Sequence, residues 1–303
     1  MDTTAMASFD AGAPAIRTRG LQMRYGDNHV LRGIDLEIAR GEVLVLLGPN
    51  GVGKTTTVEI LEGFRAPSAG EVEVLGVNPA TADDAWRAQV GIVLQSWRDH
   101  AKWRVRELLD YLGDFYAPYS GDVQRPWPID DLLASVGLSD DADTKVSELS
   151  GGRRRRLDVA SGLIGRPKLL FMDEPTAGFD PQARRDFHDL LGSLSDVDTT
   201  IVMTTHDLDE AEKVASRIVV LADGGIIADG SPDSLRRLKF GKAEVSWFDG
   251  VRRVIHATDD PVEFLRGLLA DPSAHVEQLE VRRNSLEDVY LTLMARSKEV
   301  SAR

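Results

Sequence analysis

The chain has 303 residues, of which 42% are hydrophobic and none is cysteine. This composition can form one large or two modest domains, and it excludes disulfides and thiolate metal sites. The 36 Lys and Arg residues against 49 Asp and Glu give a formal net charge of −13. That balance disfavours nucleic acid as a partner, because proteins that bind phosphate backbones are usually basic.

The first residues, Met1–Pro14, are predicted to be a disordered tail. They are small and acidic, and they contain neither the basic region nor the apolar stretch of a signal peptide. The longest apolar runs, such as Val43–Leu47, fall far short of the roughly 20 residues that a membrane helix needs. If the protein serves a membrane, we expect another chain to span it.

Apolar or alternating stretches follow the tail and predict strands that are separated by short polar turns. These stretches are Ala15–Met23, Ile34–Ile38, Val43–Leu47, Glu71–Val77 and Val90–Leu94.

The stretch GPNGVGKTT follows directly on the strand predicted at Val43–Leu47 and precedes a helix expected from about Thr55 to Gly63. It fits the phosphate-loop pattern G-x-x-x-x-G-K-[ST] in the required context of strand, turn and helix. Its glycines allow several backbone N–H groups to converge on phosphate oxygens. A glycine turn that matches by accident is the alternative, and the preceding strand argues against it.

Two side chains of this loop have expected roles of their own. Lys54 is predicted to reach the β- and γ-phosphates of a nucleotide, and the Thr55 hydroxyl to ligate Mg²⁺. The predicted nucleotide-binding residues of the loop are Gly48, Pro49, Asn50, Gly51, Val52, Gly53, Lys54, Thr55 and Thr56.

From Trp97 to Gly165 the sequence becomes helical in character, with apolar spacing in Val105–Phe115 and Ile129–Val136. A loop containing Pro118, Pro126 and Pro128 separates these two helices. We interpret the region as a helical insertion into an α/β core.

The core resumes with further apolar runs, and helical stretches fill the gaps between them. This alternation predicts a largely parallel sheet that is covered on both faces. The predicted strands are Lys168–Met172, Thr200–Thr204, Arg217–Leu221 and Ile226–Ala228.

The final stretch, Gly241–Arg303, is predicted to be a small α+β accessory domain beside the nucleotide-binding domain at 15–240. In it, Ser285 and Asp288 have capping-box spacing at the start of the last helix. The other predicted elements are strands at Ala243–Phe248, Arg253–Ala257 and Val276–Val281 and a helix at Pro261–Ala270 capped by Asp259 or Asp260.

The stretch KLLFMDEP, residues 168–175, predicts a strand that ends in two acids. Asp173 is placed to hold Mg²⁺ through its water shell, and Glu174 to polarise an attacking water. Two solvated acids that open a loop are the alternative. The phosphate loop earlier in the chain argues strongly against this alternative.

The stretch LSGG at Leu149–Gly152 precedes four arginines and an apolar helix. Ser150 is a good helix N-cap, and the amides of Gly151 and Gly152 form a second anion site at a helix start. Taken alone, the stretch could also be a capped helix with a basic first turn.

These motifs, in this order, resemble the nucleotide-binding subunit of an ATP-binding cassette (ABC) transporter over roughly Ile16–Leu235. The resemblance implies an α/β P-loop NTPase core with an antiparallel β subdomain and a helical insertion at about 97–165. It also implies an ATPase that uses ATP and Mg²⁺ and powers a separate integral membrane permease.

The resemblance assigns roles to four more residues. Tyr25 in RYG matches the aromatic residue that stacks on adenine, although it could be an ordinary tyrosine at a strand end. Gln95 in VGIVLQ matches a glutamine that contacts Mg²⁺ and water and senses the membrane subunit. Asp180 in AGFD matches a residue that crosses the dimer interface, and His206 in TTHD matches the histidine that contacts the γ-phosphate. Glu174, His206 and Gln95 are therefore the predicted catalytic residues.

In this family the LSGG residues Ser150, Gly151 and Gly152 cover the ATP of a second subunit, which implies a head-to-tail homodimer or pseudo-dimer around two ATP. Two positions depart from the family pattern, because Arg153 replaces the usual glutamine of LSGGQ and Phe179 replaces a frequent leucine. We expect activity to survive both changes, with altered affinity or dimer geometry at Arg153.

The sequences at Arg217–Leu235 and from Ser285 to Leu293 resemble the ATPases of the drug- and antibiotic-export branch, such as the daunorubicin-resistance type. This resemblance implies an exporter subunit at the cytoplasmic face of the cell membrane. Two alternatives stay open, namely a soluble cassette ATPase that acts on ribosomes or DNA and a P-loop kinase. The transported molecule is not indicated by the sequence.

Overall fold

The computed structural model describes residues 13–93, 100–121, 123–176, 179–195, 199–238, 243–282 and 285–301, without the side chains of 193–195 and 298–301. Contacts divide the chain into two compact units, Met1–Asp229 and Gly230–Arg303. The expected tail to Pro14 lies almost entirely outside the described residues, as does the expected domain boundary at Gly241.

A six-stranded sheet in the order β5-β6-β7-β3-β8-β9 forms the centre of the first unit. The pairs from β5 to β8 are parallel, as the sequence predicts. Every residue of β3 and β7 is buried, because such a sheet is covered on both faces. The strands are β5 (Val90–Val93), β6 (Leu169–Asp173), β7 (Thr200–Thr205), β3 (Val43–Leu47), β8 (Arg217–Ala222) and β9 (Gly225–Gly230).

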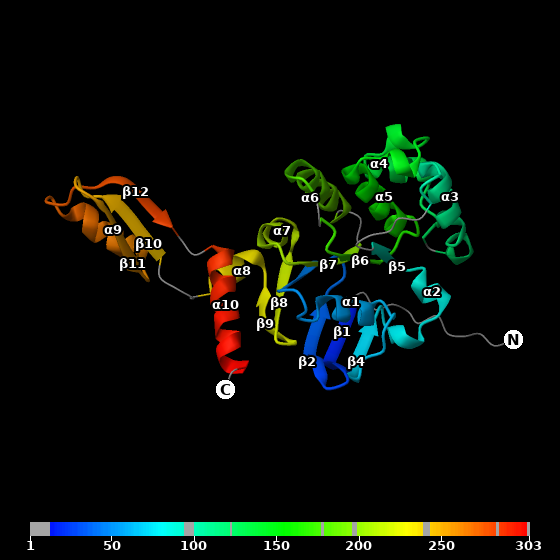
Figure 1. Ribbon diagram of the computed structural model, residues 1–303, viewed down its shortest axis with the longest axis horizontal. Helices are drawn as coiled ribbons and strands as arrows, with labels where there is room; N and C mark the ends of the chain where they lie inside the picture. Colours follow the sequence, from blue (N-terminus) through cyan, green and yellow to red (C-terminus); the bar gives the residue numbers. More distant parts are fainter. Residues whose placement is uncertain are drawn as a thin grey trace. The chain divides into compact units, whose positions relative to one another are not determined.

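A second, antiparallel sheet has the order β2-β1-β4 and consists of β2 (Asn28–Ile38), β1 (Ile16–Tyr25) and β4 (Ala69–Val74). Its core-facing residues and those of the six-stranded sheet belong to one hydrophobic cluster, in which Val58, Ile60 and Leu61 of α1 (Lys54–Leu61) also lie. Figure 1 shows α1 beside these antiparallel strands. The phosphate loop therefore connects a buried strand to a buried helix.

The helical insertion consists of α3 (Val105–Asp114), α4 (Ile129–Ser135) and α5 (Gly151–Leu163), which contact one another pairwise. They lie together at one side of the unit (Figure 1). Two further helices, α6 (Pro181–Ser195) and α7 (Leu208–Val214), contact each other, and α7 packs against β3 and β7. Short helical turns link these elements at η1 (Pro79–Thr81), α2 (Asp84–Arg87), η2 (Ala117–Tyr119), η3 (Ser139–Asp141) and η4 (Val146–Glu148).

The second unit contains a three-stranded antiparallel sheet in the order β11-β10-β12. The helix α9 (Pro261–Ala270) covers it through Phe264, whose ring stacks on His256 at a centroid distance of 4.0 Å. The last helix, α10 (Leu286–Ser301), contacts α8 (Pro232–Arg236). The strands are β10 (Ala243–Phe248), β11 (Arg253–Thr258) and β12 (Glu277–Arg282).

Two predicted strand boundaries are wrong for local reasons. The strand β2 begins at Asn28 rather than Ile34, because it forms a tight hairpin with β1 in which Tyr25 pairs with Asn28. The strand β4 ends at Val74 rather than Val77, because Leu75 and Gly76 both adopt positive φ and turn the chain. The predicted capping box is confirmed, since the Ser285 and Asp288 side chains accept each other's backbone N–H groups.

Candidate nucleotide site

The phosphate loop owes its conformation to three glycines. Gly51 and Gly53 have φ of 80° and 110°, values that side chains with a Cβ disfavour. A Cβ on Gly48 would lie 2.6 Å from the carbonyl oxygen of Leu221 in β8. Gly53 also precedes α1, whose start carries no side-chain cap. The loop is thus a tight backbone turn that leads into an uncapped helix start, which suits an anion.

Lys54 lies at the centre of the loop and is only 5% exposed. Its Nζ donates to the carbonyl oxygens of Gly48 at 2.8 Å and Pro49 at 3.3 Å, and it lies 3.8 Å from Glu174 Oε1. Burial lowers the pKa of the Lys54 amine, and the Glu174 and Asp173 carboxylates oppose this shift. The cation is therefore held between the loop and the acids of β6.

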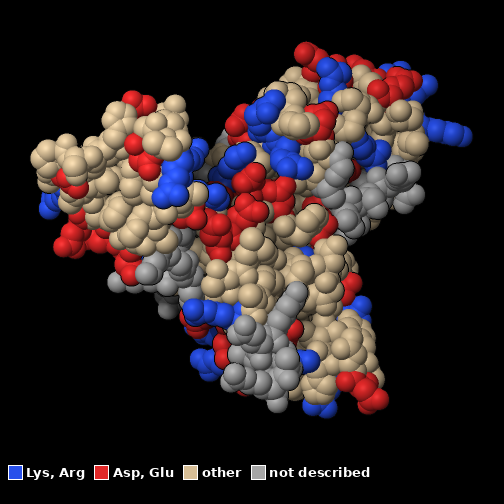
Figure 2. Space-filling view, turned by 60° about the vertical axis from the view of Figure 1, so that its left-hand side comes forward, with Lys and Arg blue, Asp and Glu red and all other residues tan. Residues whose placement is uncertain are grey.

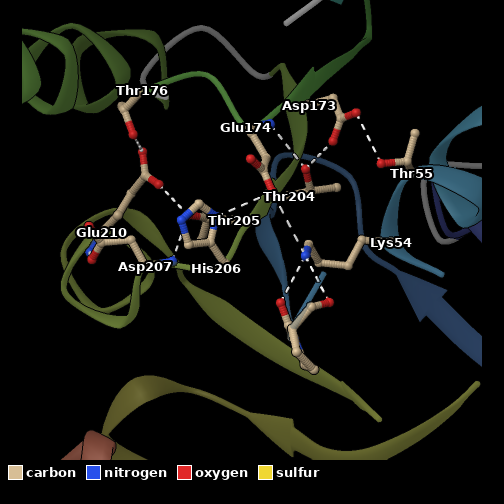
Figure 3. A network of polar contacts seen from close by, with 12 residues as sticks. Lys54, Thr55, Asp173, Glu174, Thr176, Thr204, Thr205, His206, Asp207 and Glu210 are labelled. Atoms are coloured by element: carbon tan, nitrogen blue, oxygen red, sulfur yellow. Dashed lines mark hydrogen bonds and ion pairs between the residues drawn. The ribbon is translucent and has the colours of Figure 1, made fainter. Parts of the chain in front are cut away.

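Asp173 ends β6 and receives two hydroxyl groups from different elements (Figure 3). Its Oδ2 accepts from Thr55 Oγ1 at 3.2 Å, and its Oδ1 accepts from Thr204 Oγ1. Hydroxyl and carboxylate oxygens are the ligands that Mg²⁺ prefers. The convergence of Thr55 and Asp173 on one point therefore fits a magnesium ion.

Glu174 directly follows β6 in an unusual backbone conformation, with φ of 42°. Its N–H donates to Thr204 Oγ1 at 3.0 Å, which fixes this turn against the end of β7. Its Oε1 lies 3.2 Å from Nδ1 of His206, within hydrogen-bonding reach. The imidazole is 57% exposed, so the pair can meet a ligand that arrives from solvent.

An open cleft of about 420 Å³ lies in front of these residues. Lys54 and both acids line it, together with the predicted loop residues Asn50, Gly51, Gly53, Thr55 and Thr56 and with Val30. Val52 instead packs against the hydrophobic core.

The structure holds Tyr25 outside the described lining of this cleft. It is 41% exposed at the end of β1, and the guanidinium carbon of Arg65 lies 5.1 Å from its ring centroid. Tyr25 is thus held by a cation–π contact. Its match to an adenine-stacking residue stays a prediction.

The LSGG residues also lie outside the described lining of the cleft. Ser150 caps α5, since its hydroxyl oxygen accepts from the Arg153 N–H at 3.4 Å. The Arg153 side chain points to the insertion, where its Nη1 donates to Oδ1 of the buried Asp141 at 2.9 Å. The unusual arginine is therefore engaged by its own subdomain.

Asp180 accepts hydrogen bonds from the N–H groups of Gln182 and Ala183 at the start of α6. Gln95 lies outside the described residues, so its predicted contacts with Mg²⁺ and water stay predictions. The structure thus brings Lys54, Thr55, Asp173 and Glu174 together at the cleft. His206 contacts Glu174 but, like Tyr25, Ser150 and Asp180, is not part of the described cleft lining.

Several polar residues that hold the site were not predicted from the sequence. Thr204 and Thr205 end β7, and Glu210 lies buried in α7. In α5 the buried Arg155 donates from Nε to the Pro175 carbonyl at 2.7 Å, next to Glu174. The available signal was the pair of threonines that precedes His206, because hydroxyl groups are rarely buried without hydrogen-bond partners.

A further acid, Glu62, follows the last turn of α1. Burial raises the pKa of its carboxyl group to about 8, and the nearby carboxylates of Asp173 and Glu59 add to the shift.

Comparisons with known proteins agree with this geometry. The family model described as ABC transporter matches residues 31–177. A Nod factor export ATP-binding protein I of Rhizobium sp. (strain N33) is 36% identical over 94% of this chain and 98% of its own length. The daunorubicin resistance ATP-binding protein DrrA3 of Streptomyces coeruleorubidus is 35% identical over the same shares. A fluoroquinolones export ATP-binding protein of Mycobacterium tuberculosis is 33% identical over 96% and 97%.

Solved structures show the same fold. The cbiO1 protein from Clostridium perfringens, part of the ABC transporter complex cbiONQ, aligns with a TM-score of 0.64 and 27% identity. The alignment covers 75% of this chain and 92% of that one. An ATP-binding cassette of an ABC transporter in its ADP conformation aligns with a TM-score of 0.65 over 73% and 92% of the two chains, at 24% identity. The predicted fold class is therefore confirmed.

Proposed function

Because the chain belongs to the family of ABC transporter ATP-binding proteins, we propose that it drives a separate membrane permease as the ATPase subunit of an exporter. The three relatives above carry the word export or resistance in their names and align over almost their whole length. None of the helices in the described part of the chain combines the length and hydropathy that a membrane crossing demands. A separate permease chain fits this finding.

The convergence of Lys54, Asp173, Glu174 and His206 at the phosphate loop is the observation that carries the proposal. The loop amides and Lys54 bind the phosphates, and Thr55 and Asp173 hold Mg²⁺. The metal neutralises charge on the phosphates when it is bound. Glu174 orients and deprotonates the attacking water, and His206 fixes the Glu174 carboxylate and faces the terminal phosphate.

A head-to-tail dimer around two ATP completes the proposed site. The start of α5 supports this arrangement, because none of its residues Ser150–Gly152 belongs to the described lining of the chain's own cleft. In the dimer this start covers the nucleotide that the other subunit's phosphate loop holds.

The surface proposed to meet the permease is an aromatic row on the helical insertion. Tyr111 and Phe115 follow one face of α3 and are 44% and 60% exposed. Trp103 lies 5.1 Å from Tyr111 between ring centroids, and Tyr111 lies 5.4 Å from Phe115. Exposed aromatic groups of this kind mark interaction sites. This row begins a few residues after Gln95, the predicted sensor of the membrane subunit. It supports attachment of the protein at the cytoplasmic face of the membrane.

A soluble cassette ATPase that acts on ribosomes or DNA is the rival function. Figure 2 shows acidic side chains gathered on part of the visible face, with basic side chains among and above them. The formal net charge of the chain is −13. This balance favours the transporter subunit, since a nucleic-acid backbone needs a basic surface.

Purification from detergent-solubilised membranes tests the proposal. The Glu174→Gln variant, loaded with ATP, is expected to co-purify with a polytopic membrane protein. The ATPase activity of the wild-type chain in complex with that membrane protein is expected to exceed the activity of the chain alone. The Tyr111→Ala variant should lose the partner but keep the basal activity. Retention of ribosomes or DNA instead would overturn the transporter assignment.

A further inference from the structure

Glu210 is a fully buried carboxylate that the expected reaction does not use. It lies in the first turn of α7 and is 1% exposed. Burial raises the pKa of Glu210, and two hydroxyl donors oppose the shift. The imidazole of His188 lies nearby, with Nε2 3.9 Å from Glu210 Oε1, and burial lowers the pKa of this imidazole, which favours its neutral form. A buried carboxylate is stable only when hydrogen-bond donors compensate for its lost hydration. The two donors of Glu210 therefore show which segments of the chain this side chain holds in place.

The two carboxylate oxygens of Glu210 hold two different loops (Figure 3). Oε1 accepts from Thr176 Oγ1 at 2.6 Å, and Oε2 accepts from Thr205 Oγ1 at 2.5 Å. Thr176 lies two residues after Glu174, and Thr205 directly precedes His206. One side chain thus bridges the loops that carry the proposed catalytic pair.

Hydrogen bonds on the far side of His206 complete this support. Thr205 Oγ1 also accepts from the Asp207 N–H at 3.0 Å. Asp207 in turn caps α7 by accepting from the Glu210 N–H at 3.2 Å, and it pairs with Arg184 Nη1 at 2.6 Å. The backbone is therefore fixed immediately before and after His206, while the imidazole stays exposed.

We propose that Glu210 is a positioning residue for ATP hydrolysis and that it holds His206 at hydrogen-bonding distance from Glu174. This inference rests on the proposed function. Without the bridge, the loops after β6 and β7 are joined near the site by Thr204 and by the exposed 3.2 Å contact of His206 with Glu174. Loss of Glu210 lets the imidazole drift from the carboxylate, although Lys54 and the phosphate loop are untouched.

The direct test compares three variants of the full chain. Glu210→Ala is expected to lower kcat by roughly 10- to 100-fold, the scale of a misplacement of about 1 Å, with the KM for ATP within about 3-fold of wild type. Glu210→Gln should recover most of the activity, since its amide still bonds both hydroxyl groups. Asp209→Ala, at an exposed acid one residue earlier, is the matched control and should behave like wild type.

A double-mutant cycle separates positioning from a general structural role. If Glu210 acts through His206, Glu210→Ala in a His206→Ala background causes no further loss of kcat. Independent, multiplying losses in this cycle would overturn the inference, as would a wild-type kcat for Glu210→Ala. A wild-type kcat for His206→Ala alone would instead contradict the proposed role of His206.

A milder pair of variants keeps the test decisive if Glu210→Ala does not fold. Thr176→Val removes one hydroxyl donor, and Thr205→Val removes the other together with the acceptor of the Asp207 N–H; both preserve side-chain shape. Each should lower kcat by a few-fold with unchanged ATP binding, measured by titration with a fluorescent ATP analogue. Unchanged kcat in both variants would contradict the bridge.

Discussion

The helix α1 begins directly after Gly53 and α5 begins at Gly151, yet their first turns are built differently. The start of α1 follows Gly53 without a side-chain cap, and Lys54 folds back onto carbonyl oxygens of the loop. The start of α5 has its own cap in Ser150, and Arg153 is paired with Asp141 of the insertion. The first start has no side-chain cap, whereas in the second the Ser150 hydroxyl accepts from the Arg153 N–H and the other first N–H groups remain available to an anion.

The surroundings of the two starts differ as well. In front of α1, Asp173 at the end of β6 contacts Thr55, and Glu174 directly after β6 lies near Lys54. The α5 start has four arginines in its first turns, one of which, Arg155, is buried against the turn after Glu174. We therefore assign the proposed metal-assisted chemistry to the start of α1. We interpret α5 as a lid for a nucleotide bound elsewhere, and this interpretation predicts which variants lose turnover and which lose binding.

The largest expected effect is that of Glu174→Gln. It removes the proposed base but keeps the size of the side chain, so turnover should fall by roughly 10²- to 10⁴-fold. ATP affinity should stay close to wild type, and the ATP-bound dimer should accumulate. Steady-state phosphate release measures the turnover, and size-exclusion chromatography measures the amount of ATP-bound dimer. Turnover near wild type would refute the assignment of the base.

Lys54→Ala is expected to lower ATP affinity by roughly 100-fold, because charged hydrogen bonds to a phosphate are lost at a buried site. Titration with a fluorescent ATP analogue measures the change. Lys102→Ala, at an exposed lysine of the insertion, serves as the control and should bind normally. Equal affinities of the two variants would contradict phosphate binding by Lys54 at the start of α1.

Glu62→Gln should stabilise the protein more at pH 9 than at pH 5. The folded-state pKa of about 8 lies above the roughly 4.3 of an unfolded glutamate. Between these two pKa values the folded state binds more protons than the unfolded state, so the ionisation of Glu62 lowers the free energy of unfolding as pH rises. Glutamine cannot ionise and avoids this loss, so the variant should gain about 2–5 kcal/mol in the free energy of unfolding above pH 8. Chemical denaturation of both proteins at the two pH values tests this, and a gain independent of pH would contradict it.

Ser150→Ala is expected to have the smallest effect on a single chain. The lost helix cap costs about 1 kcal/mol of stability, and ATP binding to a monomer should not change. Turnover of the dimer should fall about 10-fold, because the serine lies on the lid of the partner's nucleotide. If Ser150→Ala instead weakens ATP binding at concentrations where the chain is monomeric, α5 contributes to its own site and the comparison fails.

The sequence allowed the strands and the nucleotide loop to be predicted because each depends on a short, continuous pattern. Val43–Leu47 is apolar throughout, and the structure places β3 at those residues. The boundary of β4 could not be predicted in the same way, because the chain turns there through a positive φ at Leu75, which residues with a Cβ rarely adopt. The role of Gln95 stays a prediction, since this residue lies outside those that the structure describes.

The supporting residues of the site could not be predicted because they depend on strand order. Thr204 reaches Asp173 and Glu174 only because β6 and β7 are neighbours, although about thirty residues separate them along the chain. Glu210 reads as one acid among several on α7 until its burial is known. Contacts of this kind require the three-dimensional arrangement.

The central place of β3 ties ATP binding to the stability of the first unit. β3 lies between β7 and β8, and its five residues are buried, so the phosphate loop cannot come apart through fraying at a sheet edge. A ligand that binds only the folded loop stabilises it by about 2.7 kcal/mol at one hundred times its dissociation constant. We therefore expect ATP to delay the thermal unfolding of this sheet as one cooperative unit and to leave the melting of the Gly230–Arg303 unit unchanged.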